Sequence, residues 1–128
     1  MGKQIDTRNI GPNDLLRFLL EITSLIAYGY WGFVQDIAPL NYILMIILPV
    51  IVAIMWGVFR VPDDPSSSGK APIVVPGIIR LLLELAIFIG ASYWFYISGL
   101  MVFGIIFMII VIIHYIISYK RINWLLKH

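Results

Sequence analysis

Apolar residues fill four stretches of this chain, each long enough to form a helix that crosses a lipid bilayer. The stretches run from Leu15 to Val34, Leu40 to Phe59, Gly77 to Ile97 and Leu100 to Ser118. A membrane-spanning helix needs about 20 mostly apolar residues. The pattern therefore predicts an all-α integral membrane protein, a four-helix bundle in which residues 1–128 form a single transmembrane domain.

The segments between these stretches differ in length and composition. Ser98-Gly99 and residues 35–39 are short connections, so we expect the helices to form two antiparallel hairpins. The segment 61–76 holds four of the seven prolines, which predicts a loop. Residues 119–128 form a basic tail that also carries Trp and Leu, a composition typical of an anchor at the membrane surface.

The composition makes the lipid bilayer the expected solvent and partner of most of the chain. Of the 128 residues, 61% are hydrophobic and 12% are charged, too few polar groups to cover a soluble globule. Cysteine is absent, which excludes disulfides, cysteine-ligated metals and thiol catalysis. The formal net charge of +2 gives no reason to expect nucleic acid as a partner.

The positions of lysine and arginine indicate how the expected helices are oriented. All nine of these cations lie near the start of the first helix, around the loop 61–76 or after the fourth helix. The opposite side carries Asp36 and no cation. Cations near helix ends are retained in the cytoplasm. The N-terminus, the C-terminus and the loop 61–76 are therefore predicted to be cytoplasmic.

The first and third expected helices resemble each other. The residue pairs that align at an offset of 63 residues (80 − 17) are Arg17 with Arg80, Glu21 with Glu84, Tyr30 with Tyr93 and Trp31 with Trp94. Both helices run in the same direction, so the pattern is consistent with a parallel repeat of two hairpins. Duplication and convergence on a favourable helix-start pattern both explain it, because the second and fourth helices show no matching resemblance.

Besides Arg17 and Arg80 near the helix starts, three ionisable candidates lie deeper within the apolar stretches: Glu21, Glu84 and His114. Such residues are costly in a membrane and are functional candidates by default. Arg17 and Arg80 each precede a glutamate by four residues, so each pair lies on one helix face and can neutralise itself. One interpretation is a proton- or cation-binding cluster with His114 as a titrating member. The other is that the ion pairs only hold the helices in register.

Aromatic residues gather near the C-terminal ends of the first and third expected helices, away from Arg17 and Arg80. The aromatic candidates are Tyr28, Tyr30, Trp31, Tyr93 and Trp94. Their ring faces could bind a quaternary cation. Aromatic residues at these depths also anchor helices at the headgroup level, which is the commoner role.

The loop 61–76 carries a further set of charged candidates. Asp63 and Asp64 could bind a divalent cation or pair with Lys70. Two carboxylates are too few for a metal cage, so we expect no metal site and no cofactor. No catalytic motif is present, which leaves an enzymatic activity without support.

These residues resemble the YrdB-like family of small bacterial four-helix membrane proteins. The matching pieces are Leu16-Arg17-Phe18-Leu19-Leu20-Glu21, Gly29-Tyr30-Trp31-Gly32, Trp56-Gly57-Val58-Phe59, Pro62-Asp63-Asp64-Pro65, Gly69-Lys70-Ala71-Pro72, Val75-Pro76-Gly77 and Arg80-Leu81-Leu82-Leu83-Glu84, together with Pro49. The resemblance implies the four-helix fold, the bacterial inner membrane as location, and the Arg-Glu pairs as a hallmark. It implies no activity.

The leading functional hypothesis from the sequence is a permeation protein for ions or small solutes. We expect it to be a homo-oligomer, because four helices alone rarely enclose a pathway. The alternative is a non-transporting membrane subunit that docks a cytoplasmic or membrane protein through the loop 61–76 and the basic tail. A third hypothesis is a lipid-binding or lipid-modifying protein that uses the cytoplasmic cations on anionic headgroups.

Overall fold

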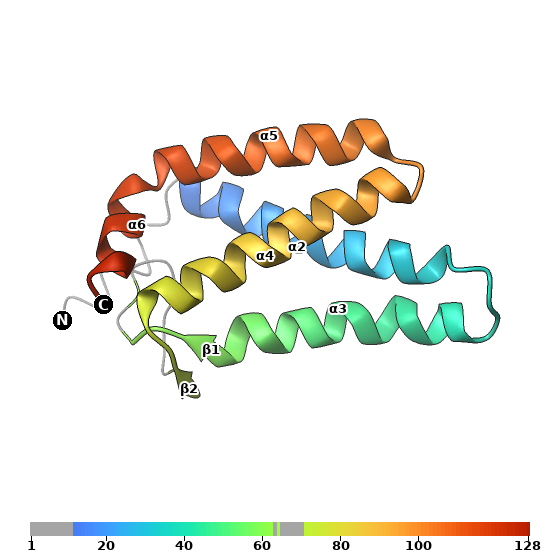
Figure 1. The fold of residues 1–128 in the computed structure, drawn as a ribbon, viewed down its shortest axis with the longest axis horizontal. Coiled ribbons are helices and arrows are strands. Elements are labelled where there is room, and N and C mark those ends of the chain that lie inside the picture. The colour runs from blue at the N-terminus through green and yellow to red at the C-terminus, as the bar shows by residue number, and fades with distance from the viewer. Residues whose placement is uncertain (1–11, 63, 65–70) are drawn as a thin grey trace.

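The described part of the chain is all-helical, as the apolar pattern predicts. A computed structural model describes residues 12–62, 64 and 71–128, and in these ranges it has five helices and one pair of short strands (Figure 1). The helices are α2 (Pro12–Phe33), α3 (Leu40–Val58), α4 (Gly77–Ile97), α5 (Met101–Ile117) and α6 (Tyr119–Leu126). The first four begin and end within a few residues of the predicted stretches.

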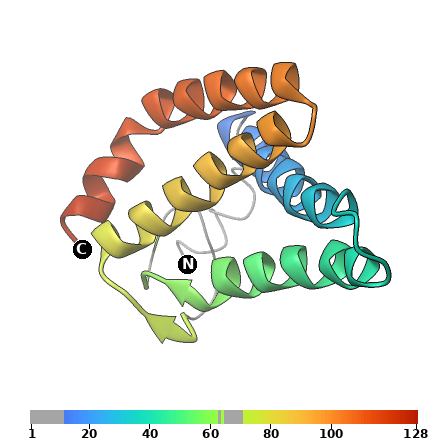
Figure 2. The ribbon, with the colours of Figure 1, turned by 45° about the vertical axis from the view of Figure 1, so that its right-hand side comes forward.

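Helices α2 and α3 form one antiparallel hairpin, and α4 and α5 form a second (Figure 1). The two short connections lie together at one end of the molecule. The opposite end carries the start of α2 and α4, the end of α3 and α5, and helix α6, and we call it the polar end. Figure 2 shows α3 and α5 on opposite sides of α4, in agreement with Figure 1.

Two short strands lie at the polar end, where the sequence predicts only a loop. Strand β1 (Phe59–Arg60) pairs in parallel with β2 (Ile73–Val74), so the described ends of the 61–76 segment are held side by side. None of the described residues of this segment before Gly77 is helical. Residues 63 and 65–70 lie outside the described part.

Helix α6 occupies most of the predicted basic tail, for which the sequence indicated no secondary structure. Residues Tyr119–Leu126 are helical and turn by 70° from α5 at Ser118, so that α6 lies across the polar end (Figure 2). The sequence prediction missed this helix because it is too short to give a strong apolar pattern. Its packing explains it, since Arg121 and Leu125 are one helical turn apart and are both buried.

Helices α3 and α4 are long and apolar enough to cross a membrane. Helices α5 and α6 meet the same test when taken together as one bent pair, and this search covered only the described residues. Helix α2 has 22 residues but does not meet it, because Arg17 and Glu21 interrupt its apolar stretch. The described structure thus provides two or three helices of spanning character.

The apolar core lies between α2, α4 and α5. Its centre is Phe88, which is fully buried and makes edge-to-face contacts with the rings of Trp56, Phe107 and Tyr115. Helix α3 packs mainly on α2 and buries only Val52. The outer faces of all the long helices are covered with exposed aliphatic side chains.

Glycines bring some of these helices into backbone contact. A Cβ atom at Gly32 of α2 would lie 2.7 Å from the carbonyl carbon of Leu44 in α3. A Cβ atom at Gly77, the first residue of α4, would overlap the backbone of Leu125 in α6. Glycine at position 77 therefore allows α6 to rest directly on the start of α4.

Candidate functional site

Glu84 of α4 lies at the centre of a buried network of charges at the polar end. Its Oε2 atom accepts hydrogen bonds from Arg17 Nη2 at 2.7 Å, Arg80 Nε at 2.8 Å and Arg121 Nη2 at 2.7 Å. Its Oε1 atom accepts from Arg121 Nη1 at 2.9 Å and from the Tyr115 hydroxyl at 2.8 Å. The Glu84 side chain is 0% exposed. Both carboxylate oxygens are thus fully occupied by donors.

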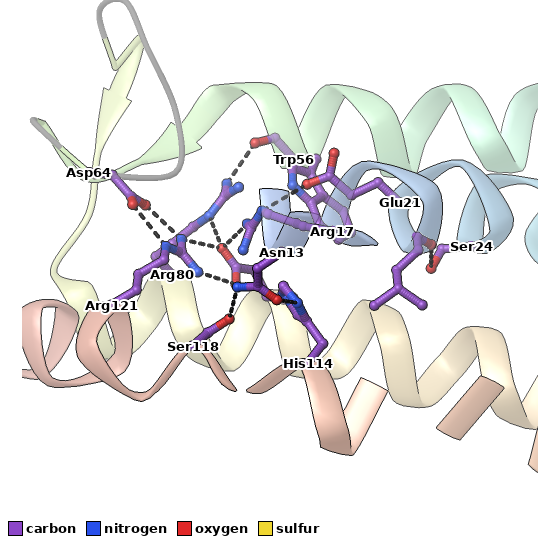
Figure 3. Close-up of polar contacts among 12 residues, drawn as sticks. Asn13, Arg17, Glu21, Ser24, Trp56, Asp64, Arg80, His114, Ser118 and Arg121 are labelled. Atoms are coloured by element: carbon purple, nitrogen blue, oxygen red, sulfur yellow. Dashed lines mark hydrogen bonds and ion pairs between the residues drawn. The ribbon is translucent and has the colours of Figure 1, made fainter. Parts of the chain in front are cut away.

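Two further carboxylates complete the network. Glu21 accepts from Arg17 Nε at 3.1 Å and keeps 27% of its side chain exposed. Asp64, which is buried, accepts from Arg121 Nε at 2.8 Å and Nη2 at 2.6 Å in a bidentate pair (Figure 3). We call the six charged residues the Glu84 cluster: Arg17, Glu21, Asp64, Arg80, Glu84 and Arg121. Three arginines face three carboxylates, so their formal charges cancel.

Arg80 also connects the Glu84 cluster to the end of α3. Its Nη1 atom donates to the carbonyl oxygens of Trp56 and Phe59, both at 2.6 Å, and its guanidinium lies 5.7 Å from the centre of the Trp56 ring. Carbonyls in the last turn of a helix lack partners within the helix and carry partial negative charge. Arg80 satisfies two of these groups, and the cluster thereby joins α2, α3, α4 and α6.

The predicted pairs within α2 and α4 are both present, but they do not stay separate. Arg17 bridges Glu21 to Glu84, and Glu84 binds two further arginines. The expectation that each pair neutralises itself was therefore incomplete. Arg121 is the cluster residue that sequence reasoning missed as a site residue. Its separation of 37 residues from Glu84 left no local spacing that could have identified it.

Asp64 has a partner that the sequence did not indicate. It pairs with Arg121 of α6. Burial opposes the charge of the Arg121 guanidinium, but its hydrogen bonds to Asp64 and Glu84 outweigh this effect and raise its pKa. Asp63 and Lys70 lie outside the described residues. Among the residues that are described, no group of His, Asp and Glu is arranged to hold a metal ion.

His114 of α5 lies beside the Glu84 cluster and is 1% exposed. Its Nδ1 atom lies 2.8 Å from Asn13 Oδ1, and Asn13 Nδ2 donates to Ser118 Oγ at 2.8 Å (Figure 3). An amide oxygen only accepts, so Nδ1 carries the proton and donates. The Nε2 atom is buried and has no hydrogen-bond partner among the described residues. In the neutral ring that atom is an acceptor.

An open pocket of about 340 Å³ lies next to the cluster, between the start of α2, the end of α5 and α6. Three cations line it, Arg17, Lys120 and Arg121, against one carboxylate, that of Asp14. Arg17 uses its Nε and Nη2 atoms on the two glutamates. The lining of the pocket is therefore rich in donors. Arg17 and Arg121 are already paired with carboxylates of the Glu84 cluster, so Lys120 is the lining cation that lies outside that cluster.

The remaining walls of the pocket are neutral. His114, Asn13 and Ser118 supply polar groups, and Ile117 and Trp124 supply apolar surface. Ile117 is 54% exposed, so the apolar outer face of α5 continues into the rim of the pocket.

The aromatic candidates lie away from the polar end and pack on one another. Trp94 contacts Trp31, with ring centroids 4.2 Å apart, Tyr28 at 6.3 Å and Tyr93 at 5.5 Å. The Tyr28 hydroxyl donates to the carbonyl of Ile87, and Tyr30 is 36% exposed. These contacts join α2 to α4.

Fold and site together define a small all-helical protein with helices of membrane-spanning character and a buried Arg-Glu cluster at one end. Residues 15–112 match the family described as "Protein of unknown function (DUF2568)". The "Uncharacterized protein YrdB" of Bacillus subtilis (strain 168) is 46% identical over 115 residues, which cover 90% of this chain and 94% of that protein. The chain therefore belongs to this YrdB-like family of unknown function, as its motifs predict. No solved structure matches it.

Proposed function

We propose that this protein is a multi-pass protein of the bacterial cytoplasmic membrane, in which α2, α3, α4 and α5 cross the bilayer as a four-helix bundle. Helices α3 and α4, and α5 together with α6, have spanning character. Helix α2 has 22 residues and is therefore long enough to cross the bilayer with them. Its charged residues Arg17 and Glu21 pair with each other, so neither would enter the lipid as a single charge. The gathering of cations at the polar end supports a cytoplasmic position for that end.

Cysteine labelling tests this orientation without any background, since the chain has no cysteine. Asp36 and Asn123 are exposed at opposite ends of the molecule. A membrane-impermeant maleimide added to intact cells is expected to label an Asp36→Cys variant (after outer-membrane permeabilisation where a host has one). An Asn123→Cys variant should be labelled only after the cytoplasmic membrane is opened. Equal labelling of the two variants in sealed cells would contradict the orientation.

The biochemical function that the site supports best is the binding of a small anionic group in the pocket at the polar end. The observation that carries it is the lining of a space of about 340 Å³, in which Lys120 lies beside the guanidinium groups of Arg17 and Arg121. The two arginines also pair with carboxylates of the Glu84 cluster, so Lys120 supplies the additional positive charge. Guanidinium and ammonium groups are the preferred protein ligands of phosphate and carboxylate. The pocket lies at a membrane surface in this topology, where anionic groups are abundant.

A cation-binding function, one of the two interpretations of these charged residues that the sequence left open, has less support. Glu84 accepts five hydrogen bonds, four of them from guanidinium groups, so it has no free charge to offer a passing cation. Permeation stays a second candidate through Glu21, which keeps part of its side chain exposed, and through the unpartnered Nε2 atom of His114. It would require the homo-oligomer expected from the sequence. A proton flux in liposomes that a Glu21→Gln variant abolishes would favour permeation over anion binding.

Two matched lysine variants test the anion site. Lys120 lines the pocket, whereas Lys127 is an exposed lysine of the same C-terminal segment outside it. Titration of the purified protein in detergent with inorganic phosphate, followed by calorimetry, should give saturable binding. Lys120→Gln should raise the Kd about two- to fivefold, as expected for the loss of a partly exposed ion pair. Lys127→Gln should leave it unchanged. Equal affinities for the two variants would contradict the proposal.

A further inference from the structure

We propose that the natural occupant of the pocket is the phosphodiester headgroup of an anionic phospholipid, which enters sideways from the cytoplasmic leaflet. This inference rests on the anion-binding function proposed above and narrows it to one ligand class. It is carried by three features: the position of the pocket at the α5–α6 bend, the charge balance of its lining, and the unpartnered nitrogen of His114.

The first feature is the opening toward the outer face of α5. Ile113, Ile116 and Ile117 are 48%, 66% and 54% exposed, and they form part of the aliphatic surface that faces lipid in the proposed topology. Ile117 also lines the pocket. A lipid can therefore place its acyl chains along this surface while its headgroup reaches the cations. Trp124, on the α6 side, is at the level where indole rings meet headgroups.

The second feature is the balance of charges in the lining. Lys120 lies outside the Glu84 cluster and suits an anion of low charge, since Arg17 and Arg121 are already paired and the Asp14 carboxylate lies in the same wall. A phosphodiester carries one negative charge, whereas a free phosphate group carries about −1.5 to −2 at neutral pH. The second charge would be repelled by Asp14. A carboxylate also has lone pairs that can accept hydrogen bonds from headgroup hydroxyls.

The third feature is the acceptor left on His114. Its Nδ1 atom is committed to Asn13, and its Nε2 atom is buried without a partner in the described ranges. Buried polar atoms usually have a hydrogen-bond partner. His114 lines the pocket, and a small rotation of its ring would bring the enclosed Nε2 atom to a bound molecule that supplies a donor. A hydroxyl of a glycerol headgroup is such a donor, and the oxygens of a phosphodiester are not. The site therefore fits a hydroxylated anionic lipid such as phosphatidylglycerol.

Native mass spectrometry of the full chain in detergent tests the inference. The probes are dioleoylphosphatidylglycerol and dioleoylphosphatidylcholine in equal amounts, with inorganic phosphate measured separately by calorimetry. We expect about fivefold tighter binding of phosphatidylglycerol, and Lys120→Gln should remove most of this preference. Lys127→Gln should retain the preference, because Lys127 lies outside the pocket.

A second pair of variants tests the sideways route. Ile117→Trp narrows the rim of the pocket, whereas Ile116→Trp places the same ring on the exposed face of α5 outside it. Ile117→Trp should weaken phosphatidylglycerol binding at least about threefold and leave the phosphate affinity unchanged, while Ile116→Trp should change neither. Since both residues are exposed, both variants are expected to fold.

The outcomes separate this inference from the proposed function. Suppose that phosphate binding depends on Lys120 but the protein does not prefer either lipid, or Ile117→Trp has no effect. Either result overturns the lipid inference and leaves the anion site standing. Equal behaviour of the Lys120 and Lys127 variants toward both phosphate and lipid overturns both. A phosphatidylglycerol preference lost in Lys120→Gln and Ile117→Trp, and kept in the two controls, supports both.

Discussion

Two equivalent glutamates in the chain allow a sharp test of how the Glu84 cluster is built. Glu21 and Glu84 are both preceded by an arginine at four residues, and both can be changed to glutamine, which removes one negative charge with little change in shape. A reading from sequence alone predicts similar effects. The structure predicts very different ones, because Glu84 is 0% exposed and Glu21 keeps 27% of its side chain exposed.

The magnitudes follow from the partners that each carboxylate leaves behind. Glu84→Gln removes the buried charge shared by three arginines and places an amide donor against guanidinium donors. Breaking a buried ion pair in this way costs about 3 to 5 kcal/mol. Glu21→Gln removes one bond of 3.1 Å at a partly exposed position, for which about 0 to 1 kcal/mol is expected. Arg17 keeps its bond to Glu84 in that variant.

Unfolding by SDS titration in mixed micelles, followed by tryptophan fluorescence, measures both effects under identical conditions. Trp56 is a suitable reporter because its ring packs against Phe88 in the core and lies beneath Arg80. The expected difference in unfolding free energy between the two variants is at least about 2 kcal/mol. A difference below about 1 kcal/mol would refute the assignment of Glu84 as the centre of the cluster.

Two further variants probe the contacts of α6. Gly77→Ala should destabilise the protein by about 1 to 3 kcal/mol in the same titration, because its Cβ atom would overlap the Leu125 backbone. At Gly57 an added Cβ atom would meet no other part of the described structure within 4 Å, so Gly57→Ala should be neutral or stabilising by up to about 1 kcal/mol. Asp64→Asn should cost about 1 to 3 kcal/mol, and a double-mutant cycle with Arg121→Gln should give a coupling of at least about 0.5 kcal/mol; strictly additive effects would argue against the bidentate pair.

The parts of the structure that the sequence predicted are those encoded locally. Helix α4 runs over Gly77–Ile97, the stretch that hydropathy indicated. The prolines before this apolar stretch and the glycine turn after it set the two ends of the helix. The ion pair of Arg80 with Glu84 followed from a spacing of four residues, which places both side chains on one helix face.

The parts that the sequence did not predict depend on contacts between distant residues. Arg121 binds Glu84 over a separation of 37 residues and Asp64 over 57, and neither spacing repeats in the chain. The sequence placed Arg121 among the nine cations of one side of the membrane, and Arg121 does lie at the polar end. Nothing in the sequence indicated that its side chain is buried. Asp64 belonged to a proline-rich loop, where nothing in the local pattern distinguishes a buried carboxylate from a solvated one.

The resemblance between α2 and α4 explains where the pocket forms. Asp14 of α2 aligns with Gly77 of α4 at the same offset of 63 residues (77 − 14). At the start of α4, Gly77 lets the Leu125 backbone of α6 contact the α4 backbone directly, so no pocket forms between α4 and α6 at this point. At the start of α2 the larger residue lines the pocket that separates it from α6. The first hairpin continues into strand β1 and the second into α6, so only the second supplies Arg121 to Glu84. The asymmetry between two similar hairpins thus produces both the buried cluster and the pocket beside it.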